Sequence, residues 1–220
     1  MLPTSGRANV CGTLEEKQIL FALLCYCLPW AQAAAAASEI MGRFGSFAEA
    51  ISVPQDDLTT LPSVPQTAAS LLKCVQAAAA RLAVVEVRDA VLLNRWDRLE
   101  TYLRSVMARD PRESLRVLFL DAKNRLLADE VMGVGDVRGV AVHPRQIVKR
   151  ALELHATALI LAHNHPSGDP TPSPEDVRMT GEVQRAAAAL GIQLHDHIVV
   201  GRAGCVSLRR MALLDDAVAA

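Results

Sequence analysis

The sequence predicts a mixed α/β domain over residues 100–220, preceded by a small all-α domain over residues 1–95. Helical runs separated by prolines fill the first hundred residues, whereas short apolar runs bounded by turn residues, which are typical of strands, first occur near residue 115. All six histidines lie in the second half of the chain. We therefore expect the α/β domain to carry the chemistry.

The first domain is divided by recognisable helix starts and stops. Thr13 and Glu16 resemble a capping box that opens a helix, and Pro29 ends it. Two prolines within residues 61–65 cannot both lie inside a helix, so this segment is predicted to be a hairpin between helices. Further helical segments are expected through the alanines to residue 41, over residues 47–51, from residue 56, and over residues 67–94.

The second domain alternates strand and helix patterns. No helix or strand is predicted for residues 96–112. Pro144 is placed to open a helix, and Gly191 to end another. Strands are expected at residues 115–120, 125–131, 159–162, 197–201 and 206–208, and helices over residues 144–154 and 175–190.

Composition and charge exclude several classes of protein. The chain has 220 residues, of which 51% are hydrophobic but only 4% aromatic, so aliphatic side chains must fill its core. A net charge of -1 excludes binding to nucleic acid through a strongly basic overall field. Five cysteines without a C-x-x-C pair fit neither a disulfide framework nor a zinc knuckle. They indicate a reducing compartment, and we expect a cytoplasmic protein.

Residues 19–37 imitate a membrane span or an export signal, because they are apolar apart from Gln32. Glu15 and Glu16 precede this run, where a signal peptide needs positive charge, and Pro29 interrupts it. Alanine also supplies little transfer energy. We therefore predict two helices and no membrane association.

The most informative stretch follows the predicted strand at residues 159–162. His163 and His165 are two positions apart on an extended backbone, so both imidazoles point to one side and can bind one ion. Ser173 is a natural N-cap for the next helix, and Asp176 in its first turn can reach the same ion. Two histidines and one carboxylate leave a fourth tetrahedral position for water, which is typical of catalytic zinc.

The spacing H-x-H-x7-S-x-x-D resembles the signature of the JAMM (MPN+) metalloproteases. The wider frame, with VHPRQIV, AHNHPSGDPTPS and DHIVVG, is similar to the bacterial RadC proteins, the UPF0758 family. The resemblance implies a JAMM/MPN-type, cytidine-deaminase-like domain with Zn²⁺ bound by His163, His165 and Asp176. It also implies hydrolysis of a peptide or isopeptide bond in a peptide or protein substrate that the sequence does not identify.

The resemblance further implies a glutamate that takes a proton from the metal-activated water. Glu130, at the end of a predicted strand and before a glycine turn, resembles the residue in this position, and Asp129 would point to the opposite face of the strand. Glu130 is the expected general base. Ser173 is the expected donor to the oxyanion.

RadC proteins usually carry a helix-hairpin-helix element whose glycine hairpin binds a DNA phosphate. Here residues 61–66 lack both glycines, and residues 1–100 hold 8 Lys and Arg against 10 Asp and Glu. The shape is expected, but at most a weak association with DNA. A DNA-repair or replication-associated protein with a structural or vestigial metal is the alternative function, and an inert MPN scaffold is a third.

A second H-x-H stands at His195 and His197, around Asp196. Three roles stay open for this triplet: support of a ligating histidine through a hydrogen bond, plain structural bonding, or an independent metal site. His143 could hold a loop against the cleft, and His155 is expected on the surface.

Overall fold

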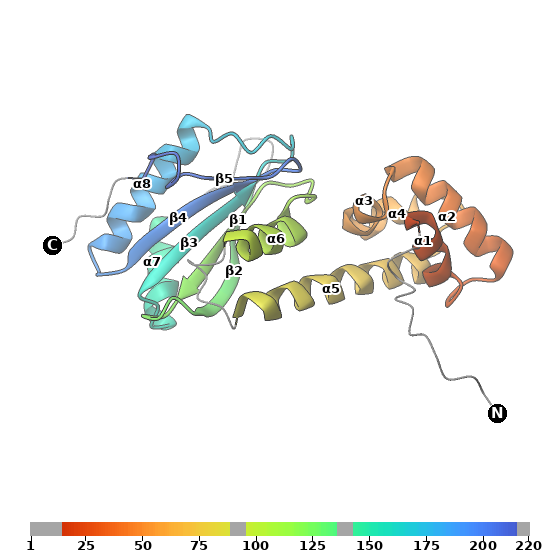
Figure 1. Cartoon of the computed structure of the whole chain (residues 1–220), viewed down its shortest axis with the longest axis horizontal. Helices are drawn as coiled ribbons and strands as arrows, with labels where there is room; N and C mark the ends of the chain where they lie inside the picture. Colours follow the sequence, from red (N-terminus) through yellow and green to blue (C-terminus); the bar gives the residue numbers. More distant parts are fainter. Residues whose placement is uncertain (1–14, 89–95, 136–142, 215–220) are drawn as a thin grey trace, which may run out of the picture. The chain divides into compact units, whose positions relative to one another are not determined.

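The computed structural model describes residues 15–88, 96–135 and 143–214. The chain divides into two compact units, residues 1–78 and 79–220, and helix α5 crosses the division. Both units are drawn in Figure 1, and each is described by itself below.

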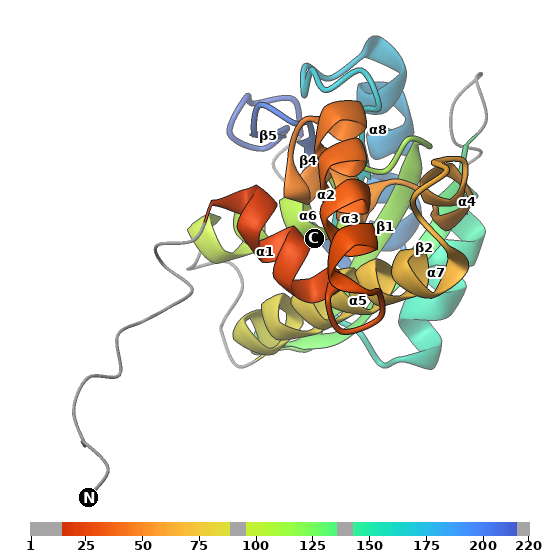
Figure 2. The ribbon, with the colours of Figure 1, turned by 90° about the vertical axis from the view of Figure 1, so that its right-hand side faces the viewer.

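The first unit is entirely helical in its described part. Its helices are α1 (Glu16–Leu24), α2 (Trp30–Phe44), α3 (Phe47–Ser52), α4 (Gln55–Thr59) and the first part of α5 (Gln66–Arg88). Leu20 and Leu24 of α1, Ile40 of α2 and Leu72 of α5 share one buried cluster with several alanines, which allow the helices to approach closely. Figure 2 shows α1, α2 and α3 packed together.

The helix boundaries follow local signals, with one correction. The N-cap of α1 is Glu15, whose capping box is completed by Gln18, whereas the predicted cap Thr13 lies outside the described residues. Pro29 is the N-cap of α2, so the proline separates the two helices as expected. Gly45 ends α2 with φ +81°, a conformation that favours glycine.

The hairpin between α4 and α5 is also present, and two of its backbone N–H groups donate within the unit. The Ser63 N–H donates to the Glu39 carboxylate of α2 over 3.0 Å, and the Val64 N–H donates to the Leu61 carbonyl. Pro62 and Pro65 have no N–H to offer.

The second unit is built on a five-stranded sheet with the order β2-β1-β3-β4-β5. Only β3 and β4 are parallel, and α8 connects them; the other neighbours are antiparallel. Its elements are α6 (Trp96–Met107), β1 (Ser114–Leu120), β2 (Leu126–Val134), α7 (Pro144–Glu153), β3 (Ala158–Asn164), α8 (Pro174–Ala188), β4 (Gln193–Val200) and β5 (Cys205–Ser207).

Helices cover both faces of this sheet (Figure 1). Alternate residues of each strand serve different cores: Leu159 and Leu161 of β3 pack with α7 and α8, whereas Ile160 and Ala162 pack with α6. His163 continues the first series and therefore faces α8.

Helix α6 was not predicted from the sequence, although its pattern is amphipathic. Leu99, Tyr102, Leu103 and Met107 are buried at helical spacing against the sheet. The other predicted elements are present, and within the described residues their bounds differ by a few residues. Residues 89–94, the predicted end of the long helix α5, lie outside the described part of the chain. Strand β4 begins four residues earlier than predicted, at Gln193, because parallel pairing with β3 extends the ladder.

Residues 19–37 contribute to two helices, as predicted. This apolar run forms parts of α1 and α2 rather than one continuous helix. Among the described residues, no helix is both long enough and apolar enough to span a membrane.

Candidate metal centre

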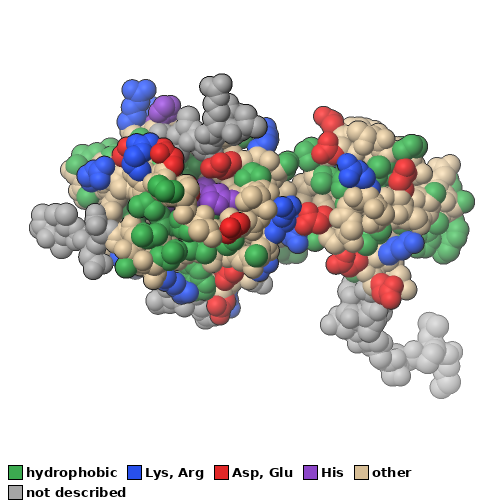
Figure 3. Space-filling view, turned by 90° about the horizontal axis from the view of Figure 1, so that it is seen from above, with side chains coloured by type: hydrophobic (Ala, Val, Ile, Leu, Met, Phe, Trp, Pro, Cys, Tyr) green, Lys and Arg blue, Asp and Glu red, His purple; other side chains and the backbone are tan. Residues whose placement is uncertain are grey.

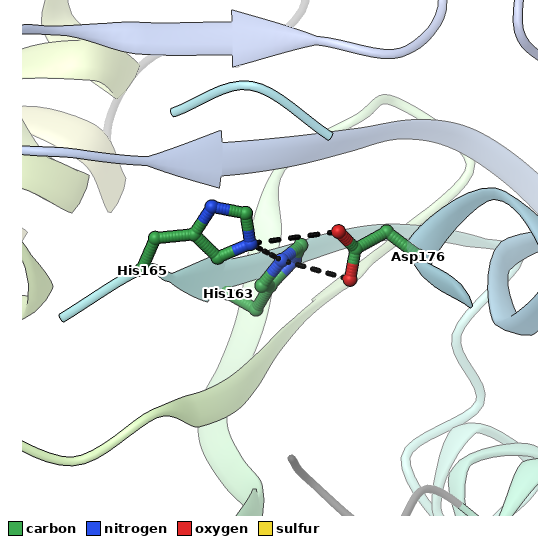
Figure 4. Close-up of side chains that lie close together, drawn as sticks. All are labelled: His163, His165 and Asp176. Atoms are coloured by element: carbon green, nitrogen blue, oxygen red, sulfur yellow. Dashed lines mark hydrogen bonds and ion pairs between the residues drawn. The ribbon is translucent and has the colours of Figure 1, made fainter. Parts of the chain in front are cut away.

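The end of β3 brings two histidines to one place. His163 is the next-to-last residue of the strand and is 2% exposed, whereas His165 follows the strand and is partly exposed. Their Nε2 atoms lie 2.9 Å apart, which confirms that both rings point to one side. Figure 4 shows both rings turned toward Asp176.

Asp176 is delivered by the first turn of α8. Ser173 is the N-cap, and its hydroxyl accepts the Asp176 N–H while the Asp176 carboxylate accepts the Ser173 N–H, which completes a capping box. The Ser173 hydroxyl also donates to Asp176 Oδ2 over 2.7 Å. The helix start therefore orients the carboxylate and leaves Oδ1 facing His163.

The distances between the three side chains fit one tetrahedral ion. His163 Nε2 lies 3.1 Å from Asp176 Oδ1, and His165 Nε2 lies 3.5 Å from Asp176 Oδ2. Bonds of about 2.0–2.1 Å to one tetrahedral ion would place ligand atoms about 3.3 Å apart. The three residues therefore form a group that can hold a metal ion, the only such group of His, Cys, Asp and Glu found in the described part of the chain.

Hydrogen bonds leave acceptor atoms facing this point. His165 Nδ1 lies 2.8 Å from the Asp169 carbonyl, which only accepts, so Nδ1 carries the proton. In the neutral ring, Nε2 then carries no proton and offers a lone pair. Asp176 contributes carboxylate oxygens, which are acceptors as well. Such a cluster needs a proton or a cation between its members, and it therefore fits a metal.

The pKa shifts of Asp176 and His165 also favour a cluster that binds a cation. Burial by itself raises the pKa of Asp176, but hydrogen bonds with His163, His165 and Ser173 outweigh it and hold this pKa well below its usual range. The hydrogen bond to Asp176 raises the pKa of His165, and the Asp169 carbonyl and the Glu113 charge add to the effect. Asp176 thus stays ionised, and a proton at His165 is the competitor of a metal ion.

Comparison with known families places a RadC-like JAB domain over residues 93–213, more than half of the chain. A UPF0758 protein from Rhodobacter capsulatus is 45% identical over 201 residues, which cover 91% of this chain and 94% of that protein. This chain belongs to the RadC (UPF0758) family. His163, His165 and Asp176, the group that can hold a metal ion, lie inside this JAB domain.

Within this RadC-family domain, the loop after His165 is held tightly. The His165 N–H donates to the Val200 carbonyl, and the Arg202 guanidinium donates to the Pro166 and Ser167 carbonyls. Gly168 has φ +92° and lies under the Arg202 side chain. The β4–β5 turn therefore positions the loop that orients His165.

Asn164, between the two histidines, points to the other face of the sheet and is wholly buried. Its Oδ1 accepts from the N–H and the hydroxyl of Ser114, and its Nδ2 donates to the Asp110 and Arg112 carbonyls. The side chain thus connects the end of β3 to the segment that leads into β1.

Glu130 lies on the same face of the sheet as the metal centre, but its carboxylate has another partner. Arg150 of α7 donates to both of its oxygens, the shortest distance being 2.7 Å, and these bonds lower the pKa of Glu130. Along the sheet Glu130 stands across β1 from Leu161, two residues before His163. Asp129 points to the opposite face, as predicted, and pairs there with Arg116.

Glu113 is a second acid near the centre, which the sequence analysis missed. Leu115 of β1 pairs with His163, and continuing this antiparallel register by two residues places Glu113 beside His165. The Glu113 charge contributes to the raised pKa of His165. The sequence shows that Glu113 directly precedes a predicted strand, but only the order of the strands in the sheet reveals that His165 is its neighbour.

The other histidines and Asp196 have different surroundings. His197 is wholly buried and contacts His163, whereas Asp196 accepts from the Ser207 hydroxyl and from two backbone N–H groups. His195 lies beside the Asn124 side chain, and within the described residues the second H-x-H belongs to no group of three or more residues that could hold a metal ion. Two other histidines lie apart from the centre: His143 occupies the exposed N-cap of α7, and His155 is exposed at the surface.

On the surface of the α/β unit, one patch of histidine lies between acidic side chains (Figure 3). His165 itself is 19% exposed, whereas the side chain of Asp176 is 10% exposed. The centre is therefore reached from the side of His165.

Gly201→Ala should disturb the centre from outside it. A Cβ at Gly201 would lie 2.4 Å from the Gly168 carbonyl oxygen, and backbone cannot move aside cheaply. We expect a loss of about 1–3 kcal/mol in unfolding free energy together with weaker metal binding, measured by denaturant unfolding and metal titration. Gly42→Ala in α2 is the control, because nothing lies within 4 Å of its Cβ. Equal metal affinity in Gly201→Ala and wild type would contradict the role of this loop.

Metal affinity should fall at acidic pH. The pKa of His165 is raised, so its proton competes with the metal above the pH at which an ordinary histidine would. Affinity should decrease as pH falls through this raised pKa, by about tenfold per pH unit for one displaced proton. Asp176 adds no dependence there because its pKa is far lower. Dissociation constants measured between about pH 5 and pH 8 test this, and an unchanged value would contradict it.

Proposed function

We propose that this RadC-family protein is a zinc-dependent hydrolase that cleaves a peptide or isopeptide amide bond. The observation that carries the proposal is the near-tetrahedral spacing of His163, His165 and Asp176 within a JAB domain. Three protein ligands leave one position for water or substrate, which is the arrangement of catalytic zinc sites. The nitrogen and oxygen donor set also suits zinc.

When bound, zinc would lower the pKa of water at the open position and polarise the carbonyl under attack. The protein's own part is to hold the ligands and to move a proton. This chemistry needs no covalent intermediate, and neither Ser173 nor a cysteine has to act as a nucleophile.

Two glutamates are candidates for the base that accepts the proton and returns it to the leaving amine. Glu113 is favoured because the β1–β3 register places it beside His165 and it is half-buried there. Glu130, the residue expected from the sequence, would first have to leave Arg150, whose hydrogen bonds make it a weaker base.

Ser173 has two possible contributions. Its hydroxyl donates to Asp176 Oδ2, so it orients a ligand. As an oxyanion donor it would have to turn this proton toward the substrate, where one donor is typically worth about 3–4 kcal/mol of transition-state stabilisation.

A DNA-binding function is less well supported by the described hairpin. A DNA phosphate would need free N–H groups there, but the Ser63 N–H already donates to the Glu39 carboxylate. That negative charge would also repel a phosphate. We therefore keep the hydrolase as the single proposal, acting in the cytoplasm on a peptide or protein.

The first test is metal content. Wild-type protein should bind about one zinc per chain, and Asp176→Ala or the double variant His163→Ala/His165→Ala should lose most of it, because the two ligands left in the first and the one left in the second hold the ion poorly. Elemental analysis after dialysis measures this. Asp196→Ala, which changes an acid outside the centre, is the control. Full zinc retention by Asp176→Ala would rule out the assigned ligand set.

The base is identified by two matched variants. Glu113→Gln should keep zinc but lower hydrolysis of fluorogenic peptide and isopeptide libraries by about 10²–10⁴-fold, whereas Glu130→Gln should retain most activity. The reverse result would assign the proton transfer to Glu130. If wild-type protein with full zinc cleaves no amide substrate, the hydrolase proposal fails.

A further inference from the structure

A line of buried, hydrogen-bonded side chains runs from Nδ1 of His163 into helix α8. His163 Nδ1 lies 2.7 Å from His197 Nε2, and His197 Nδ1 contacts the Thr180 hydroxyl. That hydroxyl in turn contacts the backbone carbonyl of Asp176. His197 and Thr180 are both 0% exposed, so bulk water does not compete for these bonds.

Counting protons along this line assigns each one. The Asp176 carbonyl only accepts, so the single Thr180 hydroxyl proton is donated to it. Thr180 Oγ1 must then accept from His197, which places a proton on Nδ1 of that ring.

The count continues into the metal centre. A wholly buried ring without a carboxylate partner is favoured in its neutral form, so His197 Nε2 has no proton and accepts from His163 Nδ1. The remaining nitrogen of His163, Nε2, is then unprotonated and faces Asp176 and His165. This is the form that a metal requires.

We propose that Thr180 and His197 are positioning residues that hold His163 in the tautomer whose Nε2 lone pair faces the metal centre. The inference rests on the proposed metal-dependent function. It assigns a role to one residue of the second H-x-H and to a threonine that no motif marked.

The line of hydrogen bonds begins at one residue that faces the proposed metal position, His163, and ends at another, Asp176. Thr180 and Asp176 are one turn apart on α8, and the carbonyl that ends the line belongs to the residue whose carboxylate faces His163. Helix α8 therefore supplies one ligand directly and controls the proton of a second through β4. Side chains that direct a ligating histidine in this way typically change metal affinity by about 10–100-fold when they are removed.

Removing the hydroxyl should release this control. In Thr180→Val, which keeps the shape, His197 Nδ1 has no acceptor, so its proton can move to Nε2. His197 would then donate to His163 Nδ1 and leave the proton of His163 on Nε2, where it blocks the metal.

The experiment compares Thr180→Val with Thr180→Ser, which restores a hydroxyl. Zinc affinity is measured by competition with a chromophoric chelator, and the tautomers of His163 and His197 are read from imidazole ¹⁵N NMR of the metal-free protein. The expected result is about 10–100-fold weaker zinc binding in Thr180→Val, with new Nε2–H signal for His163. Thr180→Ser should recover both affinity and spectrum.

Ser207→Ala is the matched control for lost stability. Ser207 is also buried, and its hydroxyl donates to Asp196 outside this line. It should lower the unfolding midpoint without changing zinc affinity or the tautomers. The inference is overturned if Thr180→Val keeps wild-type affinity and spectrum, or if Ser207→Ala weakens zinc binding equally. A wild-type protein that binds no zinc would instead defeat the proposed function, and the spectra would still decide the tautomers.

Discussion

The convergence of three proton-accepting groups at the end of β3 is the constraint on which the rest of the α/β unit depends. His163, His165 and Asp176 approach one another closely enough to share one cation, and without a proton or a cation they would repel. Their positions require a strand end, a tight loop and a helix start in one place. The capping box at Ser173, the Arg202 contacts and the β3–β4 pairing each hold one of these parts.

Much of this centre could be predicted from the sequence because its geometry is local. The alternation of an extended strand is enough to place His163 and His165 on one side, and an N-cap serine with an acid three residues later is a local helix start. The five strands could likewise be recognised as short apolar runs. Helix α6 was missed because its buried residues are spaced among charged ones, although its periodicity was present.

What could not be predicted depends on neighbours that are distant in the sequence. Glu113 becomes a candidate base only when β1 is known to lie beside β3, whereas Glu130 could not be seen to bond with Arg150 before α7 was placed on the same face. The contact between His197 and His163 requires the parallel pairing of β3 and β4. Local motifs therefore predict the group that can hold a metal ion, and tertiary contacts identify the residues that contact this group.

Asn164 has a consequence for how the strand can assemble. A slip of β3 by one residue would exchange its two faces, which would bury the imidazoles under α6 and leave an amide in place of His163. The four hydrogen bonds of Asn164 would all be broken by such a slip, and its polar atoms would lose their partners. Asn164, between the two histidines, thus disfavours the shifted register of β3. Only the observed register brings His163 and His165 to the centre.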